Sequence, residues 1–153
     1  MTKTRKMLNK TNRNCTAQER ILFVILQCSW GILQTLIGVI VFCIMIRCPH
    51  KRYRGSIDTR WNLEKGLSLG LFLFTPNEET PDTNELRVHE YGHCIQSMLL
   101  GPFYLILVLI SMIWAGFPYF VKLRKEKHIP YTACFVESWA SKWGEQITGE
   151  QAI

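Results

Sequence analysis

Two long apolar stretches interrupt an otherwise polar chain. The first, residues 21–46, contains no charged side chain, and a helix of this length can cross a bilayer core of about 30 Å. It lacks the small-residue ending of a cleaved signal peptide. We therefore predict a basic tail over residues 1–20, a retained membrane helix over 21–46, and a domain over 47–153 that contains the second apolar segment, 98–121.

Between the apolar stretches the pattern predicts short strands followed by a helix. The segments RYRGSIDTRWNL and KGLSLGLFLFTP each predict a strand, so together they form a β-hairpin or a small sheet. Asp82 and Glu85 have capping-box spacing, which places a helix start near Thr83. A last helix is predicted from FVESWASKWG. The predicted fold class is membrane-associated α+β.

The charge distribution indicates a lipid partner and no nucleic-acid partner. The net charge is +6, and most basic residues flank the apolar stretches, in residues 1–20, 47–54 and 122–127. Basic flanks hold helix ends at anionic headgroups, and no nucleic-acid-binding motif accompanies them. The six cysteines form no CxxC pair. This favours reduced thiols in a cytoplasmic or membrane-embedded protein.

The segment HEYGH, residues 89–93, predicts a metal site. On a helix His89 and His93 lie on one face, so both imidazoles can bind one zinc ion. Glu90 lies about 100° round the helix, where it can act as general base on a zinc-bound water whose pKa is lowered to about 7. Gly92 costs about 1 kcal/mol in a helix. We attribute it to the close approach of a neighbouring strand.

A third ligand must come from beyond the motif. The candidates are Cys94, Glu126, His128, Cys134, Glu137 and Glu145. Cys94 points about 100° away from His93 and is poorly placed. Glu137 lies on the predicted last helix, and Ala140, one turn later, is small enough to let two helices approach. Glu137 is therefore the preferred third ligand.

The chain resembles a known group of proteins in KGLSLGLFLF, HEYGHCIQSMLLGPFYL and CFVESWASKWG. These segments are similar to small, largely uncharacterised bacterial membrane-associated proteins with a minimal gluzincin-type zinc metallopeptidase core, over roughly residues 30–147. The resemblance implies that His89, His93 and Glu137 are zinc ligands and that Glu90 is the base. It also implies a location in the cell membrane of a bacterium or archaeon.

The resemblance further implies a substrate-binding edge strand. An extended peptide would add to residues 67–71, which are Leu67, Ser68, Leu69, Gly70 and Leu71. Gluzincins often stabilise the oxyanion with a Tyr or His beyond the third ligand. Here the available residues are His128 and Tyr131, which precede Glu137.

The position of Glu137 constrains the second apolar segment. If 98–121 crossed the membrane as a straight helix, His93 and Glu137 would lie on opposite sides, and no ion could bind both. We therefore expect a bent or re-entrant segment, with breaks at Gly101-Pro102, at Ser111 or at residues 116–118. The site would then lie at the membrane surface or just within it, on the cytoplasmic side.

These features predict a zinc metallopeptidase that hydrolyses peptide bonds. The alternative is a non-catalytic membrane scaffold or partner-binding protein with a structural zinc site. The two differ in the fourth metal position. A structural site is closed by a fourth protein ligand, whereas a catalytic site leaves that position open.

Overall fold

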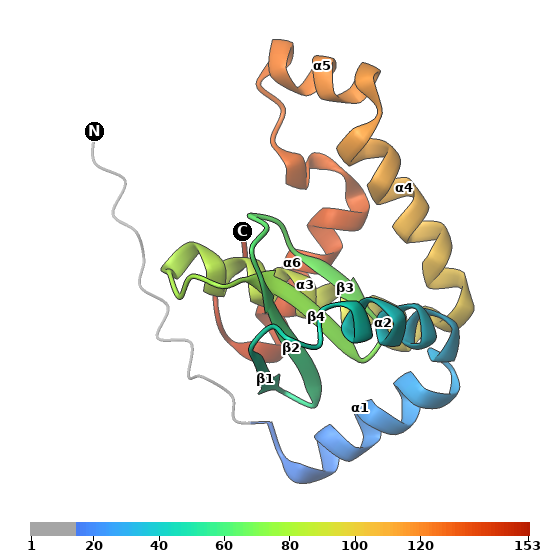
Figure 1. The fold of residues 1–153 in the computed structure, drawn as a ribbon. Helices are drawn as coiled ribbons and strands as arrows, with labels where there is room; N and C mark the ends of the chain where they lie inside the picture. The colour runs from blue at the N-terminus through green and yellow to red at the C-terminus, as the bar shows by residue number, and fades with distance from the viewer. Residues whose placement is uncertain (1–14) are drawn as a thin grey trace.

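The computed structural model describes residues 15–153, which form an α+β fold (Figure 1). The elements are α1 Ala17–Ser29, α2 Ile32–Ile44, β1 His50–Tyr53, β2 Ser56–Trp61, β3 Leu67–Leu69, β4 Phe72–Pro76, α3 Pro81–Leu100, α4 Tyr104–Gly116, α5 Pro118–Lys127 and α6 Phe135–Thr148. Residues 1–14 of the predicted basic tail lie outside the described residues. The helix expected from residue 21 already begins at Ala17, because Thr16 and Glu19 form a capping box.

The sheet has the strand order β1-β2-β4-β3. Each segment predicted as one strand is in fact a hairpin, because a tight turn divides it. Arg54 and Gly55 both have positive φ, 49° and 100°, as the turns of two-residue hairpins require. Gly70, with φ of 60°, serves the β3–β4 turn. The two hairpins join through the parallel pair β2–β4.

Helices cover both faces of the sheet, with α2 on one face and α3 on the other (Figure 1). Strand β4 packs against the helices on both faces, because its side chains alternate between the faces. Phe72 and Phe74 belong to the core cluster beneath α2. Leu73 packs with the α3 residues Tyr91 and Ile95.

A buried charge network joins the sheet to α3. Asp58 Oδ2 lies 3.1 Å from Arg60 Nε and 3.0 Å from Arg87 Nε. Thr75 donates a hydrogen bond of 2.7 Å to the other oxygen of Asp58. The Asp58 and Arg60 side chains are almost fully buried, so their charges depend on this pairing.

The first apolar stretch does not form the single helix predicted over 21–46. It forms α1 and α2, which are bent by 95°. The polar side chains within the stretch explain the bend, because they bind α3 at the corner. Gln27 donates to the Cys94 carbonyl at 2.9 Å, and Gln34 donates to the Ser97 hydroxyl at 2.8 Å. A straight helix would leave these amides without partners in lipid.

The helix that carries HEYGH crosses α6 at very short range. A Cβ on Gly92 would lie 1.8 Å from the Ala140 carbonyl oxygen, and one on Gly144 would lie 2.2 Å from the Val88 carbonyl oxygen. Gly92 therefore permits a close approach as predicted, but the neighbour is a helix and not a strand. Helix α3 itself begins at Pro81, capped by Thr80 and not by the predicted Asp82.

The second apolar segment breaks at two of the three expected places. Gly101 has φ of 53° and precedes a 3₁₀ turn, and Phe117 separates α4 from α5. Ser111 lies within α4 and does not interrupt it. Helices α4 and α5 extend beyond the sheet at the end opposite α1 (Figure 1).

The helical run Pro81–Gly116 is long and apolar enough to cross a membrane. If α1 and α2 count as one broken span, the described chain has two such candidates. These are statements of length and composition alone. Much of the apolar surface of α1, α2 and α4 is exposed.

Candidate metal centre

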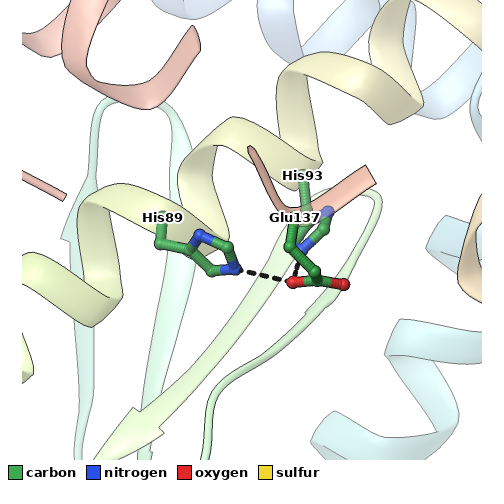
Figure 2. Close-up of side chains that lie close together, drawn as sticks. All are labelled: His89, His93 and Glu137. Carbon is green, nitrogen blue, oxygen red and sulfur yellow. Dashed lines mark hydrogen bonds and ion pairs between the residues drawn. The ribbon is translucent and has the colours of Figure 1, made fainter. Parts of the chain in front are cut away.

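Three potential ligands converge between α3 and α6. His89 and His93 come from adjacent turns of α3, and Glu137 comes from the first turn of α6 (Figure 2). Glu137 Oε2 lies 3.1 Å from His89 Nε2 and 3.3 Å from His93 Nε2. All three residues are buried and offer ligand atoms within 4.8 Å of one another. The convergence expected from HExxH and Glu137 is confirmed, and Glu137 lies on the same side as His93.

Partners on the far side of each imidazole fix its tautomer. The Ser141 hydroxyl donates a hydrogen bond to the backbone oxygen of Ile153, so its oxygen accepts a hydrogen bond of 2.8 Å from His89 Nδ1. Gln96 donates its amide to the Val136 carbonyl, so its oxygen accepts from His93 Nδ1 at 2.8 Å. In the tautomer with its proton on Nδ1, each ring points an Nε2 lone pair towards Glu137.

In these tautomers the site presents three acceptors, a set that can bind a cation. Neither Nε2 carries a proton in these tautomers, and an ionised carboxylate has none to give. Zinc bonds of about 2.0–2.1 Å in a tetrahedron separate ligand atoms by about 3.3–3.4 Å. The observed separations of 3.1 and 3.3 Å agree with that spacing. The donor set and these two separations thus fit a metal ion of this size.

Helix α4 holds the remaining oxygen of Glu137. The Ser111 hydroxyl donates a short hydrogen bond to Oε1. Burial raises the pKa of Glu137. When the imidazoles carry a proton on Nε2, their hydrogen bonds together with that from Ser111 outweigh burial and hold that pKa well below its usual range. Glu137 is therefore an ionised carboxylate, as a metal ligand must be.

Glu90 lies beside the three ligands and is not one of them. Its carboxylate packs against Gly66, where an added Cβ would come within 2.2 Å of Oε1. Glu90 is buried, and within the described chain its side chain accepts no hydrogen bond. It lines the same cavity as His89 and His93. This is the position expected for a general base.

The cavity in front of the site has a volume of about 670 Å³. One wall is segment 64–68, which leads into β3, and the opposite wall is α4. The α4 residues that line it are Tyr104, Leu107, Val108, Ser111, Met112 and Ala115. The wall is largely apolar, so the cavity suits an apolar chain with a few polar anchoring points.

The expected substrate-binding strand is shorter than predicted. Strand β3 is an edge strand, as expected, but it spans only Leu67–Leu69. Gly70 and Leu71 form the turn and lie against α2, where Thr35 accepts a hydrogen bond from the Leu71 amide at 3.3 Å. Ser68 is also engaged, since its carbonyl accepts from Tyr104. The part that borders the cavity is therefore 64–68.

Other candidate ligands lie elsewhere. Cys94 is buried on the sheet side of α3, 3.2 Å from the Ser68 hydroxyl. Neither Cys134 nor His128 belongs to the three-residue group found within residues 15–153. His128 is exposed at the end of α5, whereas Tyr131 lines the cavity and lies 3.4 Å from Ser111. Burial raises the pKa of Tyr131 to about 12, so it stays a neutral phenol.

The sequence reasoning missed the residues that support the ligands. Ser141 follows Glu137 by four positions, and Gln96 follows His93 by three. Polar residues at these spacings share a helix face with the ligand, which is a signal that could have identified both. No spacing in the sequence links Ser111 to a ligand, because its contact with Glu137 depends on how α4 packs against α6.

Comparisons with protein-family models, with curated protein sequences and with solved structures give no match to this chain. The resemblance to gluzincin-type metallopeptidases therefore remains an expectation based on the motifs.

Proposed function

We propose that the protein is a membrane-associated zinc metallopeptidase. The observation that carries the proposal is the convergence of three acceptors, His89 Nε2, His93 Nε2 and Glu137 Oε2, around one point that faces a cavity. Partners of the two imidazoles leave both Nε2 atoms free for a cation. Zinc is the metal that two imidazoles and one carboxylate most often bind in hydrolases.

The mechanism assigns one task to each polar group in the cavity. When bound, zinc supplies a Lewis acid that polarises the peptide carbonyl and makes a coordinated water acidic, with a pKa of about 7. Glu90 takes the proton of the attacking water on its carboxylate and passes it to the leaving amine. Because Ser111 donates to Glu137, the neutral Tyr131 hydroxyl donates to Ser111 and so supports the same carboxylate. Ser111 keeps Glu137 oriented.

The open fourth position favours catalysis over a structural role. A structural zinc site would need a fourth protein ligand, and the group within residues 15–153 contains three. The unpartnered carboxylate of Glu90 beside the ligands also has no purpose in a structural site. These two features support the enzyme over the scaffold alternative.

The exposed apolar helices support a membrane location. Exposed apolar side chains lie on α1, α2 and α4, including Ile21, Ile25, Leu36, Ile40, Ile106 and Leu109. A surface of this kind on a chain with a net charge of +6 suits a bilayer with anionic headgroups. We propose that the site lies at the cytoplasmic face of a bacterial or archaeal cell membrane, with a peptide or protein as substrate.

Zinc content and hydrolysis test the proposal. The purified protein in detergent should hold close to one zinc per chain. His93→Ala should remove the zinc, whereas His128→Ala, a histidine outside the site, should not. Glu90→Gln should keep the zinc and abolish cleavage of a mixed peptide library followed by mass spectrometry. Full zinc occupancy in His93→Ala, or cleavage by zinc-loaded Glu90→Gln, would refute the assignment.

A further inference from the structure

One cation in the cavity has no anionic partner. Arg124, on α5, lines the same cavity as the three ligands. Within residues 15–153 no carboxylate lies within ion-pair distance of it. The neighbouring Glu126 approaches Lys122 instead, at 3.8 Å. A partly buried guanidinium without a counter-ion is costly to keep, which points to a ligand that supplies the negative charge.

The guanidinium of Arg124 is held in place by three groups. Its Cζ lies 5.4 Å from the ring centres of both Trp114 and Tyr131. Its Nη2 donates to the Ala115 carbonyl at 3.0 Å. Trp114 in turn donates to the Tyr131 carbonyl at 2.8 Å. Cation–π contacts of this kind hold a guanidinium in place and lower its hydration, which prepares it for a carboxylate.

The hydrogen-bonding capacity of Arg124 is largely unused. Nε is buried without a partner, and Nη2 alone donates within the described chain. A guanidinium has five N–H donors arranged as a fork that matches a carboxylate. Arg124 therefore has donors left for an incoming anion.

The spacing of two contacts on α4 indicates how many substrate residues fit between the metal centre and Arg124. On α4, Ser111 contacts Glu137, and Ala115, one turn later, contacts Arg124. One turn of helix rises about 6 Å over four residues. An extended peptide advances about 3.4 Å per residue. A carboxylate on Arg124 would thus lie one or two residues beyond a peptide bond at the metal centre.

We propose that Arg124 binds the C-terminal carboxylate of the substrate, so that the enzyme removes one or two residues from peptide C-termini. This inference rests on the proposed metallopeptidase function. Water adds across the peptide bond, the carbonyl carbon becomes a new carboxylate, and the released residue or dipeptide carries the new amine. The apolar wall formed by Leu107, Val108 and Met112 favours apolar C-terminal residues.

A binding experiment tests the proposal without requiring hydrolysis. The zinc-loaded Glu90→Gln protein in detergent is titrated with three N-acetylated peptides: Leu-Leu-Phe as free acid, the same peptide as amide, and Leu-Leu-Asp amide. A charge-assisted hydrogen bond is worth about 1.5–3 kcal/mol, so the free acid should bind about 10- to 100-fold more tightly than the Phe amide. The Asp amide tests whether a side-chain carboxylate can replace the C-terminus.

Substitutions of the basic residues on α5 complete the test. Arg124→Gln should make acid and amide bind equally, Arg124→Lys should keep part of the preference, and Lys122→Gln should keep all of it. Thermal unfolding of each variant checks that it is folded. Equal or undetectable binding of acid and amide to the Glu90→Gln protein would overturn the proposal. So would a preference that survives Arg124→Gln, or an Asp amide that binds as well as the acid.

The outcomes also separate this inference from the proposed function. Zinc content and cleavage are measured on the unsubstituted protein. If zinc is bound and internal peptide bonds are cleaved with no carboxylate preference, the metallopeptidase stands and the role of Arg124 is wrong. If no zinc is bound, the metallopeptidase is wrong, and the same peptide titrations on the zinc-free protein and on its Arg124→Gln variant decide whether Arg124 recognises a carboxylate.

Discussion

Gly92 is the position where the smallest chemical change should have the largest effect on the metal centre. It lies between His89 and His93, where α3 meets the backbone of α6. A Cβ placed there would lie 1.8 Å from the Ala140 carbonyl oxygen and 2.5 Å from its carbon. Reaching an ordinary contact of 3.4 Å requires α3 and α6 to separate by about 1.6 Å. The obstacle is backbone, so no side-chain rotation relieves it.

A separation of this size should disable the site. Glu137 lies one turn before Ala140 on α6, so the movement carries its carboxylate away from both imidazoles. Metal–ligand distances tolerate only about 0.2 Å, and even loss of an outer partner lowers metal affinity by about 10- to 100-fold. We predict that Gly92→Ala lowers zinc affinity by at least about 100-fold. Alanine favours the helix by about 1 kcal/mol, but overpacking costs about 1–3 kcal/mol, so the zinc-free protein should also be less stable.

Gly116 provides the matched control. It is the last residue of α4, and a Cβ there meets no atom within 4 Å. Gly116→Ala should leave zinc affinity unchanged and stability equal or up to about 1 kcal/mol higher. Zinc affinity is measured by competition with a chromophoric chelator, and stability by thermal unfolding after chelation. A Gly92→Ala protein that binds zinc as tightly as Gly116→Ala would refute the close helix crossing.

Three further substitutions test other parts of the structure. Ser111→Ala removes the hydroxyl that holds Glu137 and should lower zinc affinity about 10-fold in chelator competition. Unchanged affinity would show that the Ser111 hydrogen bond does not support the site. Asp58→Asn removes the negative charge that pairs with two arginines and should destabilise the protein by about 3–5 kcal/mol in thermal unfolding. Lys51→Gln is the control at an exposed ion pair and should change stability by less than about 1 kcal/mol. Gln34→Leu leaves buried partners on α3 without a donor and should cost about 1–3 kcal/mol. A Gln34→Leu protein of equal or greater stability would show that the α1–α2 corner does not depend on this amide.

The ligand set could be predicted from sequence because it depends on local rules. Helical spacing places His89 and His93 on one face without knowledge of the fold. Glu137 could be selected among the candidates because Ala140, one turn later, is small enough to let two helices approach. The position of the third ligand also predicted a break in the second apolar segment, and the structure has breaks at Gly101 and at Phe117.

The arrangement of the first apolar stretch could not be predicted from hydropathy. Average hydropathy treats Gln27 and Gln34 as minor exceptions in an apolar run. In the structure each finds a specific partner on α3, 60 to 70 residues away in the sequence. Those partners are not visible until α3 is in place. The same dependence on distant contacts explains why two predicted strands became two hairpins.

One of the apolar helices, α4, forms part of the cavity at the candidate metal centre. Helix α2 covers one face of the sheet, and α4 supplies the wall opposite segment 64–68. Ser111 of α4 bonds to Glu137, and the Ala115 carbonyl fixes Arg124. Both groups therefore depend on a helix whose outer face is apolar and exposed. If this outer face lies in lipid, as proposed, the candidate metal centre and the proposed carboxylate site should form fully only when the helix is embedded, and the proposed activity should then depend on the membrane surface.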